Sequence, residues 1–255
     1  MLHRARFTVH GFRFTAHGSR FTIHGMIKAI FFDFNGVIID DEPVQLKAYQ
    51  SALQAVDIPL TEEQYYSALG MDDRAFVEAS FARAGKELSE QQRQSIIERK
   101  SELHRELIKD ELPLFPGVET FLKATSRRYA LGLVSMARRR EIDYVLERAQ
   151  LGSQFTVQIS AEDVSHHKPD PECYRLALEK LNAWRQGRQL PSLPARDCVA
   201  IEDAPPGIEA ARAVGMLTIG VTNTVSEGQL RAARADVVTS SLADWTADAV
   251  HLLFD

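Results

Sequence analysis

Polar and charged residues follow four apolar segments of the chain, at the points where those segments end. Carboxylates are the hard oxygen ligands that Mg²⁺ binds, and a carboxylate can also act as a nucleophile that forms an aspartyl-phosphate. A lysine and a hydroxyl nearby can hold a phosphoryl group. The residues are Asp33, Asn35 and Gly36 after the first segment, Ser135 after the second, Lys168 in the loop after the third, and Glu202 with Asp203 after the fourth. Together they predict magnesium-assisted phosphoryl chemistry.

The elements that position these residues alternate between strands and helices. Such alternation is typical of right-handed βαβ units and a parallel sheet, and ligands of such sheets bind at the carboxyl ends of the strands. We therefore expect an α/β fold with a Rossmann-like parallel sheet. Apolar runs predict its strands at 27–32, 130–135, 156–160, 198–201, 217–221 and 236–238.

A block without a comparable strand interrupts this pattern directly after the first strand. It contains helical patterns at 44–56, 61–69, 74–84 and 89–108, and two of these begin with capping-box signatures. The expected organisation is a core formed by residues 26–40 and 114–255, with an all-helical domain inserted at 41–113.

The motifs resemble those of the haloacid dehalogenase superfamily, in the branch that includes β-phosphoglucomutase and phosphoglycolate phosphatase. The match covers residues 27 to about 223, and a helical insert lies between its first and second motifs. The four motifs are FFDFNGVIIDDE from Phe31, VS at Val134, KPDP from Lys168 and IEDAPPGIEAA from Ile201.

The resemblance implies a function for each motif residue. Asp33 would be the nucleophile and a Mg²⁺ ligand, and the backbone carbonyl of Asn35 would be a second ligand. Glu202 and Asp203 would complete the metal site, while Ser135 and Lys168 would bind the phosphoryl group together with the backbone around Gly36. The inserted domain would be the helical cap that closes over the site and selects the substrate.

Asn35 departs from the family pattern, in which phosphatases carry a second Asp that protonates the leaving group and activates water. An amide cannot transfer a proton at neutral pH, and general acid–base catalysis contributes roughly 10²–10⁴-fold. If Asn35 were simply a missing acid, Asn35→Asp should raise turnover; no gain would indicate a site adapted to Asn.

Several activities are compatible with these motifs. A magnesium-dependent phosphatase for a small phosphorylated metabolite is favoured, and it could be slow. A catalytically weak protein that binds a phosphorylated ligand is the first alternative, and a phosphomutase also needs the missing proton transfer. A phosphonate-cleaving enzyme is disfavoured because the stretch from Gly70 to Arg74 has no lysine, and a dehalogenase because Glu202 and Asp203 preserve a metal pair.

Within the predicted cap, Asp72 and Arg74 follow Gly70 in a turn between helices. In the family this turn reaches toward the substrate. Arg74 could therefore pair with a second anionic group of the substrate, although a solvated surface arginine is an equally plausible interpretation. The sequence does not name the substrate.

Composition excludes several other classes of protein. The 255 residues are 45% hydrophobic and 25% charged, with a net charge of −5, which is ordinary for a globular protein and argues against nucleic acid as a ligand. Apolar runs are too short for a membrane span, and the two cysteines fit a reducing compartment, so we expect a cytoplasmic location. The oligomeric state is not fixed by the sequence, and a monomer is compatible with it.

The first 25 residues contain a seven-residue repeat, RFTxHGx, that begins at Arg6, Arg13 and Arg20. These 25 residues include four Arg and no acid, so they contribute +4 and the other residues −9; the repeat itself holds three of the four Arg. Its Gly and Thr disfavour a coiled coil; a histidine metal array and a transit peptide are weaker alternatives. We expect residues 1–25 to be a disordered arm outside the fold, with the natural start at Met26.

Overall fold

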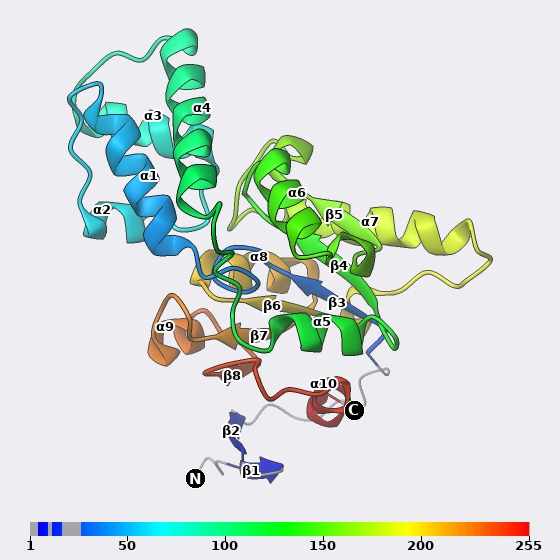
Figure 1. Cartoon of the computed structure of the whole chain (residues 1–255). Helices are drawn as coiled ribbons and strands as arrows, with labels where there is room; N and C mark the ends of the chain where they lie inside the picture. Colours follow the sequence, from blue (N-terminus) through cyan, green and yellow to red (C-terminus); the bar gives the residue numbers. More distant parts are fainter. Residues whose placement is uncertain (1–4, 10–11, 17–26, 255) are drawn as a thin grey trace.

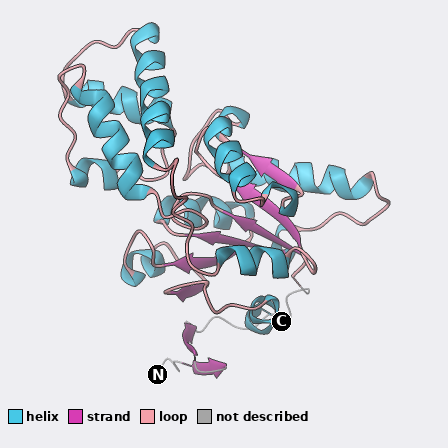
Figure 2. Ribbon diagram, in the orientation of Figure 1, coloured by secondary structure: helices cyan, strands magenta, loops and turns pink. Residues whose placement is uncertain are grey.

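A six-stranded parallel sheet forms the centre of the molecule (Figures 1 and 2). The structure is a computed structural model, and it describes residues 5–9, 12–16 and 27–254. The strand order is β5-β4-β3-β6-β7-β8. This arrangement confirms the predicted α/β fold. The strands are β3 (Ala29–Phe32), β4 (Ala130–Val134), β5 (Val157–Ile159), β6 (Cys198–Glu202), β7 (Leu217–Val221) and β8 (Val237–Thr239).

Helices cover both faces of the sheet. Successive residues of a strand point to opposite faces, so Ile30 and Phe32 of β3 pack in one apolar cluster and Ala29 and Phe31 in another. Burial on both faces explains why β3 is an unbroken apolar run. The first cluster includes α5 (Val118–Thr125), α6 (Arg139–Arg148) and α10 (Ala247–Phe254), and the second includes α7 (Glu172–Gln186) and α8 (Pro205–Val214); α9 (Glu227–Ala232) packs beside β8.

Four helices between β3 and α5 form a separate block with its own apolar cluster, centred on Leu53 and Val77. In Figure 1 this block lies beyond the carboxyl ends of the strands, at the upper left. The two linkers that join it to the sheet run side by side, and Asp40 N of the first donates a hydrogen bond to Pro113 O of the second at 2.6 Å. The helices are α1 (Glu42–Gln54), α2 (Glu62–Tyr66), α3 (Asp73–Arg83) and α4 (Glu90–Leu107).

The N-terminal repeat differs in part from the expected disordered arm. β1 (Ala5–Val9) and β2 (Phe12–Ala16) pair as two antiparallel strands in a sheet of their own. The rest of the predicted arm, residues 1–4, 10–11 and 17–25, lies outside the described residues, as does Met26.

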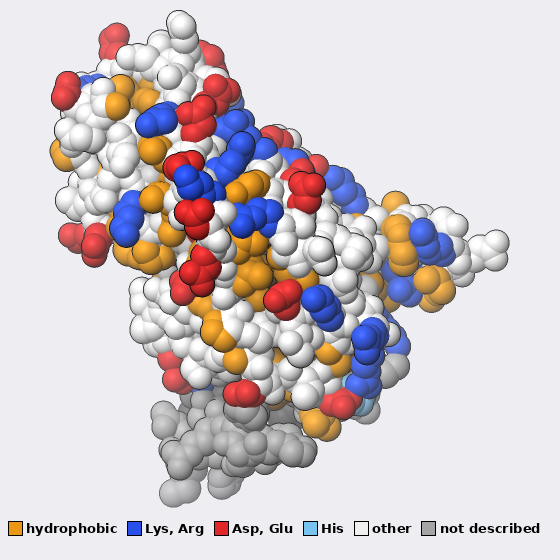
Figure 3. All heavy atoms as spheres, in the orientation of Figure 1, with side chains coloured by type: hydrophobic (Ala, Val, Ile, Leu, Met, Phe, Trp, Pro, Cys, Tyr) orange, Lys and Arg blue, Asp and Glu red, His pale blue; other side chains and the backbone are white. Residues whose placement is uncertain are grey.

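Acidic and basic side chains are interspersed over the face of the molecule drawn in Figure 3. Among the described residues, no helix is both long and apolar enough to cross a lipid bilayer. Cys173 and Cys198 are free thiols in the core, and the cytoplasmic location stays a prediction.

Candidate active site

A cavity lies between the carboxyl ends of the strands and the helical block. The sheet side of this cavity carries most of the residues that the motifs single out. They are Asp33, Asn35, Ser135, Lys168, Glu202 and Asp203. The helical block contributes the opposite wall, from α1, α2, α3 and α4 and the turn at Gly70.

Asp33 and Lys168 form an ion pair at the floor of the cavity. The Lys168 Nζ lies 3.1 Å from Asp33 Oδ1 and donates to Val134 O at 3.1 Å. Phe34 N also donates to Asp33 Oδ1, at 2.8 Å. Burial opposes the charge of Lys168, but the carboxylates of Asp33 and Glu202 outweigh it and raise the lysine pKa. Both of these contacts of Asp33 are therefore made by the same carboxylate oxygen, Oδ1.

Three carboxylates meet beside this ion pair. Oxygen atoms of Asp33, Glu202 and Asp203 all lie within 4.8 Å of one another. Burial raises the pKa of Glu202 and of Asp203 well above the usual range, and the charge of Asp33 raises both further. Such repulsion between buried acids is what a divalent cation offsets, so this donor set fits Mg²⁺.

Two glycines allow these carboxylates to come close to the backbone. A Cβ at Gly36, where φ is +72°, would lie 2.0 Å from Asp203 Oδ2. A Cβ at Gly207 would lie 1.9 Å from Glu202 Oε2. Gly36 therefore makes room for Asp203, and its predicted part in substrate binding stays a prediction. Both positions need glycine because any side chain would displace a buried carboxylate.

Ser135 and Asn35 complete the sheet side of the cavity. The Ser135 hydroxyl accepts a hydrogen bond from Ala137 N at 3.0 Å, and its residue is buried. The Asn35 side chain turns toward Asp41, to which its Nδ2 donates at 2.8 Å. The peptide bond between Lys168 and Pro169 is cis.

Residues 27–215 match the profile of the haloacid dehalogenase-like hydrolases. The chain belongs to this family. It is 31% identical over 206 residues to a phosphorylated carbohydrates phosphatase of Thermotoga maritima, and the aligned part covers 80% of this chain and 89% of the relative. It is 27% identical over 230 residues to a β-phosphoglucomutase of Bacillus subtilis, with 88% and 94% covered.

Solved structures support the same fold for this haloacid dehalogenase-like hydrolase. A β-phosphoglucomutase of Clostridium difficile matches with a TM-score of 0.77 at 23% identity, over 90% of this chain and 97% of that one. CbbY from Rhodobacter sphaeroides in complex with xylulose-(1,5)bisphosphate matches with a TM-score of 0.72 at 25% identity, over 86% and 96%. At 23% identity, the Clostridium difficile structure shows only that the two chains share a fold.

A second buried lysine lies on the helical side of the hydrolase's cavity, and the sequence analysis did not identify it. Lys100 Nζ of α4 lies 3.0 Å from Asp73 Oδ1 of α3 and 3.2 Å from Glu141 Oε2 of α6. Asp73 also accepts from the Tyr49 hydroxyl at 2.5 Å. Although burial acts to raise the pKa of Glu141, the charge of Lys100, together with a hydrogen bond from Ser101, outweighs burial and lowers that pKa. No motif groups these residues, because each comes from a different helix.

Arg74 and Asp72, which the sequence analysis placed at the substrate, lie elsewhere. Arg74 Nε pairs with Glu78 Oε1 at 3.2 Å on the surface of α3, and neither side chain is buried. Asp72 caps α3 by accepting from Ala75 N at 2.7 Å. The residue between them, Asp73, is the one that reaches the cavity.

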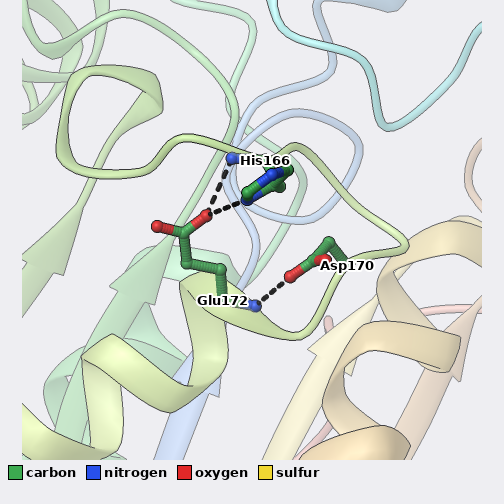
Figure 4. A group of neighbouring side chains, drawn as sticks. All are labelled: His166, Asp170 and Glu172. Carbon is green, nitrogen blue, oxygen red and sulfur yellow. Dashed lines mark hydrogen bonds and ion pairs between the residues drawn. The ribbon is translucent and has the colours of Figure 1, made fainter.

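A further group with metal-ligand chemistry lies in the loop that carries Lys168 and at the start of α7 (Figure 4); it consists of His166, Asp170 and Glu172. One side-chain atom of each residue makes a hydrogen bond within the loop or between the loop and α7. Glu172 Oε2 accepts from His166 N at 2.8 Å and lies 2.9 Å from His166 Nδ1, and Asp170 Oδ1 accepts from Glu172 N at 2.9 Å. These contacts order the loop and thereby support the position of Lys168.

Proposed function

We propose that the protein is a magnesium-dependent phosphatase that acts on a small phosphorylated metabolite through an aspartyl-phosphate at Asp33. The observation that carries this proposal is the contact of Lys168 Nζ with Asp33 Oδ1 at 3.1 Å, beside the carboxylates of Glu202 and Asp203. The family and its phosphatase relatives support the same reaction class.

Each residue has a distinct task in the proposed reaction. Asp33 attacks phosphorus, the bond from phosphorus to the leaving oxygen breaks, and that oxygen keeps the electron pair. Lys168 and the Ser135 hydroxyl bind phosphoryl oxygens as charge develops on them. Water then attacks the phosphorylated Asp33, which releases phosphate and restores the carboxylate.

Mg²⁺ would be held by Asp33, Glu202, Asp203 and the backbone carbonyl of Asn35. When bound, it would offset the repulsion between the nucleophile and the phosphate dianion. Asn35 cannot give its proton to the leaving oxygen, so that oxygen is protonated from water. The reaction should therefore be slower, by up to about 10²–10⁴-fold, than one with an acid at this position.

The charges around the cavity favour a substrate with one phosphate. Among the described lining residues there are six carboxylates and two lysines, and each lysine already contacts two carboxylates. None of the described lining residues therefore offers a free cation to a second phosphate. Carboxylates and the Tyr49 hydroxyl instead suit neutral hydroxyl groups. We infer that residues 41–113 act as the cap that presents these groups to a sugar or polyol monophosphate.

Release of inorganic phosphate from a panel of esters tests the function. The panel contains sugar monophosphates, phosphoglycolate and nucleoside monophosphates, each with and without Mg²⁺. We expect Mg²⁺-dependent release by the wild type and a loss of about 1,000-fold or more in Asp33→Asn. Equal release by both proteins would contradict a reaction at Asp33.

Thermal unfolding tests the metal site without reference to activity. A ligand that binds the folded state raises its stability, so Mg²⁺ should raise the unfolding temperature of the wild type and have little effect on Asp203→Asn. A protein stabilised by Mg²⁺ and phosphate that releases no phosphate from any ester would instead be a phospho-ligand-binding protein. A phosphomutase of the β-phosphoglucomutase type would convert the phosphosugar without releasing phosphate.

A further inference from the structure

A buried carboxylate lies directly behind Asn35. Asp41 has no solvent exposure. Its Oδ1 accepts from Asn35 Nδ2 at 2.8 Å, and its Oδ2 lies 3.0 Å from the same nitrogen. Oδ2 also accepts from Gln45 Nε2 at 3.0 Å and lies 2.7 Å from His104 Nε2. One carboxylate therefore connects the loop after β3 with both α1 and α4.

Helix capping does not explain the position of the Asp41 side chain. Asp41 is the N-cap residue of α1, a position where an Asp side chain ordinarily accepts from a backbone N–H of the first turn. Here the Asp41 side chain makes no such hydrogen bond. It turns instead toward Asn35 and His104, so its position serves these side chains and not the helix end.

The chemistry of the pair determines which end of the Asn35 amide faces the cavity. An ionised carboxylate only accepts hydrogen bonds, so the Asn35 nitrogen must face Asp41 and the oxygen must point away from it. Asn35 lines the cavity beside Asp33, whereas Asp41 and His104 are not among its described lining residues. The amide oxygen is therefore the end that the cavity receives.

We propose that Asp41 is a positioning residue that fixes the Asn35 carboxamide so that its oxygen, and not its NH₂ group, is presented beside the nucleophile. This inference rests on the proposed phosphatase function. Gln45 and His104 hold the other face of the Asp41 carboxylate and thereby keep it in place.

The orientation of the amide matters for the second step of the reaction. A water that attacks phosphorus must direct a lone pair at it, and an acceptor oxygen can hold the water by its hydrogen. An NH₂ group in the same place would bind that lone pair and weaken the nucleophile. Asn35 thus orients the water without taking its proton.

Asn35→Asp alone should therefore lower turnover, and not raise it. The substitution would place a carboxylate oxygen where a nitrogen now lies 2.8 Å from the buried Asp41 carboxylate. Two like charges at that distance repel, and the new side chain would leave the position that Asn35 holds. The reciprocal exchange, Asn35→Asp with Asp41→Asn, restores one amide and one carboxylate.

Steady-state kinetics with p-nitrophenyl phosphate and saturating Mg²⁺ test this pair, because this leaving group needs no protonation. We expect each single variant to lose about tenfold or more in kcat with KM within about threefold, and the reciprocal double variant to recover to within about threefold of the wild type. Asp143→Asn, the same change on the exposed face of α6, should leave kcat unaltered. A double variant as weak as the product of the two singles, or a gain in Asn35→Asp alone, would overturn the proposal.

Hydrogen exchange of the Asn35 NH₂ group tests the pair without any substrate. The signal is assigned in ¹H–¹⁵N spectra by its absence from Asn35→Asp. In the wild type we expect it to exchange about tenfold or more slowly than exposed Gln side chains, and to lose that protection in Asp41→Ser. An unprotected Asn35 amide in the wild type would overturn the proposal even if no variant folds. If the Asn35 amide is protected but the protein releases no phosphate, the Asn35–Asp41 pair stands and the phosphatase function is rejected.

Discussion

Lys168 and Lys100 occupy the same kind of environment in two different parts of the molecule. Each side chain is 3% exposed, and each Nζ lies within 3.2 Å of two carboxylates. In both cases the neighbouring charges outweigh burial and raise the lysine pKa. The partners are Asp33 and Glu202 for Lys168, and Asp73 and Glu141 for Lys100.

The two lysines differ in what holds their partners together. All three groups at Lys168 belong to the sheet and its loops, so their geometry does not depend on the helical block. Lys100 and Asp73 belong to that block, whereas Glu141 lies on α6 beside the sheet. Any movement of the block would separate Lys100 from Glu141. The comparison indicates that the ion pairs of Lys168 depend on the sheet side alone, whereas those of Lys100 depend on how the helical block packs against α6.

The largest effect is expected from Lys168→Met. The substitution leaves the buried Glu202 and the partly buried Asp33 without their cation and removes the charge that would bind the phosphoryl group. We expect kcat to fall by about 10²–10³-fold and the free energy of unfolding to fall by about 3–5 kcal/mol. Enzyme assays and denaturant unfolding measure the two losses. Lys123→Met, on the surface of α5, is the control, and a Lys168→Met enzyme within about tenfold of the wild type would contradict this assignment.

Lys100→Met should affect stability and substrate binding more than chemistry. It leaves Asp73 and Glu141 buried without their cation, which should lower the free energy of unfolding by about 3 kcal/mol. Because Lys100 does not contact Asp33, we expect KM to rise by about tenfold with a smaller change in kcat. Lys47→Met, on an exposed position of α1, should change neither. A loss in kcat as large as that of Lys168→Met would erase the distinction between the two lysines.

Glu42 lines the same cavity as the two lysines, and its carboxylate accepts a hydrogen bond from the Tyr65 hydroxyl. Burial, followed by the charges of Asp41 and Asp33, raises its pKa from 4.5 to about 7. The folded protein therefore binds this proton more tightly than the unfolded chain, and the free energy of unfolding should fall as pH rises from about 4.5 to 7. Removing the charge should flatten this slope. The free energy of unfolding of Glu42→Gln, measured relative to that of the wild type, should therefore be about 1–2 kcal/mol higher at pH 8 than at pH 4.5.

Denaturant unfolding at several pH values, in metal-free buffer, measures the Glu42 effect. Glu202 and Asp203 also have raised pKa values, so the Glu42→Gln variant keeps a slope of the same sign, and the difference between the two proteins isolates Glu42. Parallel curves for wild type and Glu42→Gln would show that Glu42 does not carry the raised pKa.

The sheet and its carboxyl-end residues could be predicted because both follow from local patterns. The run Ala29–Phe32 is apolar at every position because both of its faces are buried, and parallel strands bring the residues after them to one edge. Asp33, Lys168 and Glu202 therefore meet in the structure although they lie far apart in the chain.

The helical wall could not be predicted in the same way. Lys100 lies in a helix of largely polar sequence, and only the packing of α1, α3, α4 and α6 brings it to Tyr49, Asp73 and Glu141. The Asp41 network was also missed, because an Asp before a helix ordinarily indicates a cap. This sequence pattern fits two uses of one carboxylate, and the contacts of Asp41 with Asn35 and His104 distinguish them.

The smallest effect is expected from Arg74→Ala. Its guanidinium forms a surface pair with Glu78, and the side chains are 68% and 45% exposed, so the free energy of unfolding should change by no more than about 0.5 kcal/mol. Asp73 is one residue earlier, about 100° around the helix, and faces the cavity. Kinetics with the best substrate of the phosphate-ester panel should show kcat/KM within about twofold of the wild type for Arg74→Ala and a loss of about tenfold for Asp73→Asn. The reverse order would mean that α3 turns when substrate binds, and that the helical wall described here is not the one that the substrate meets.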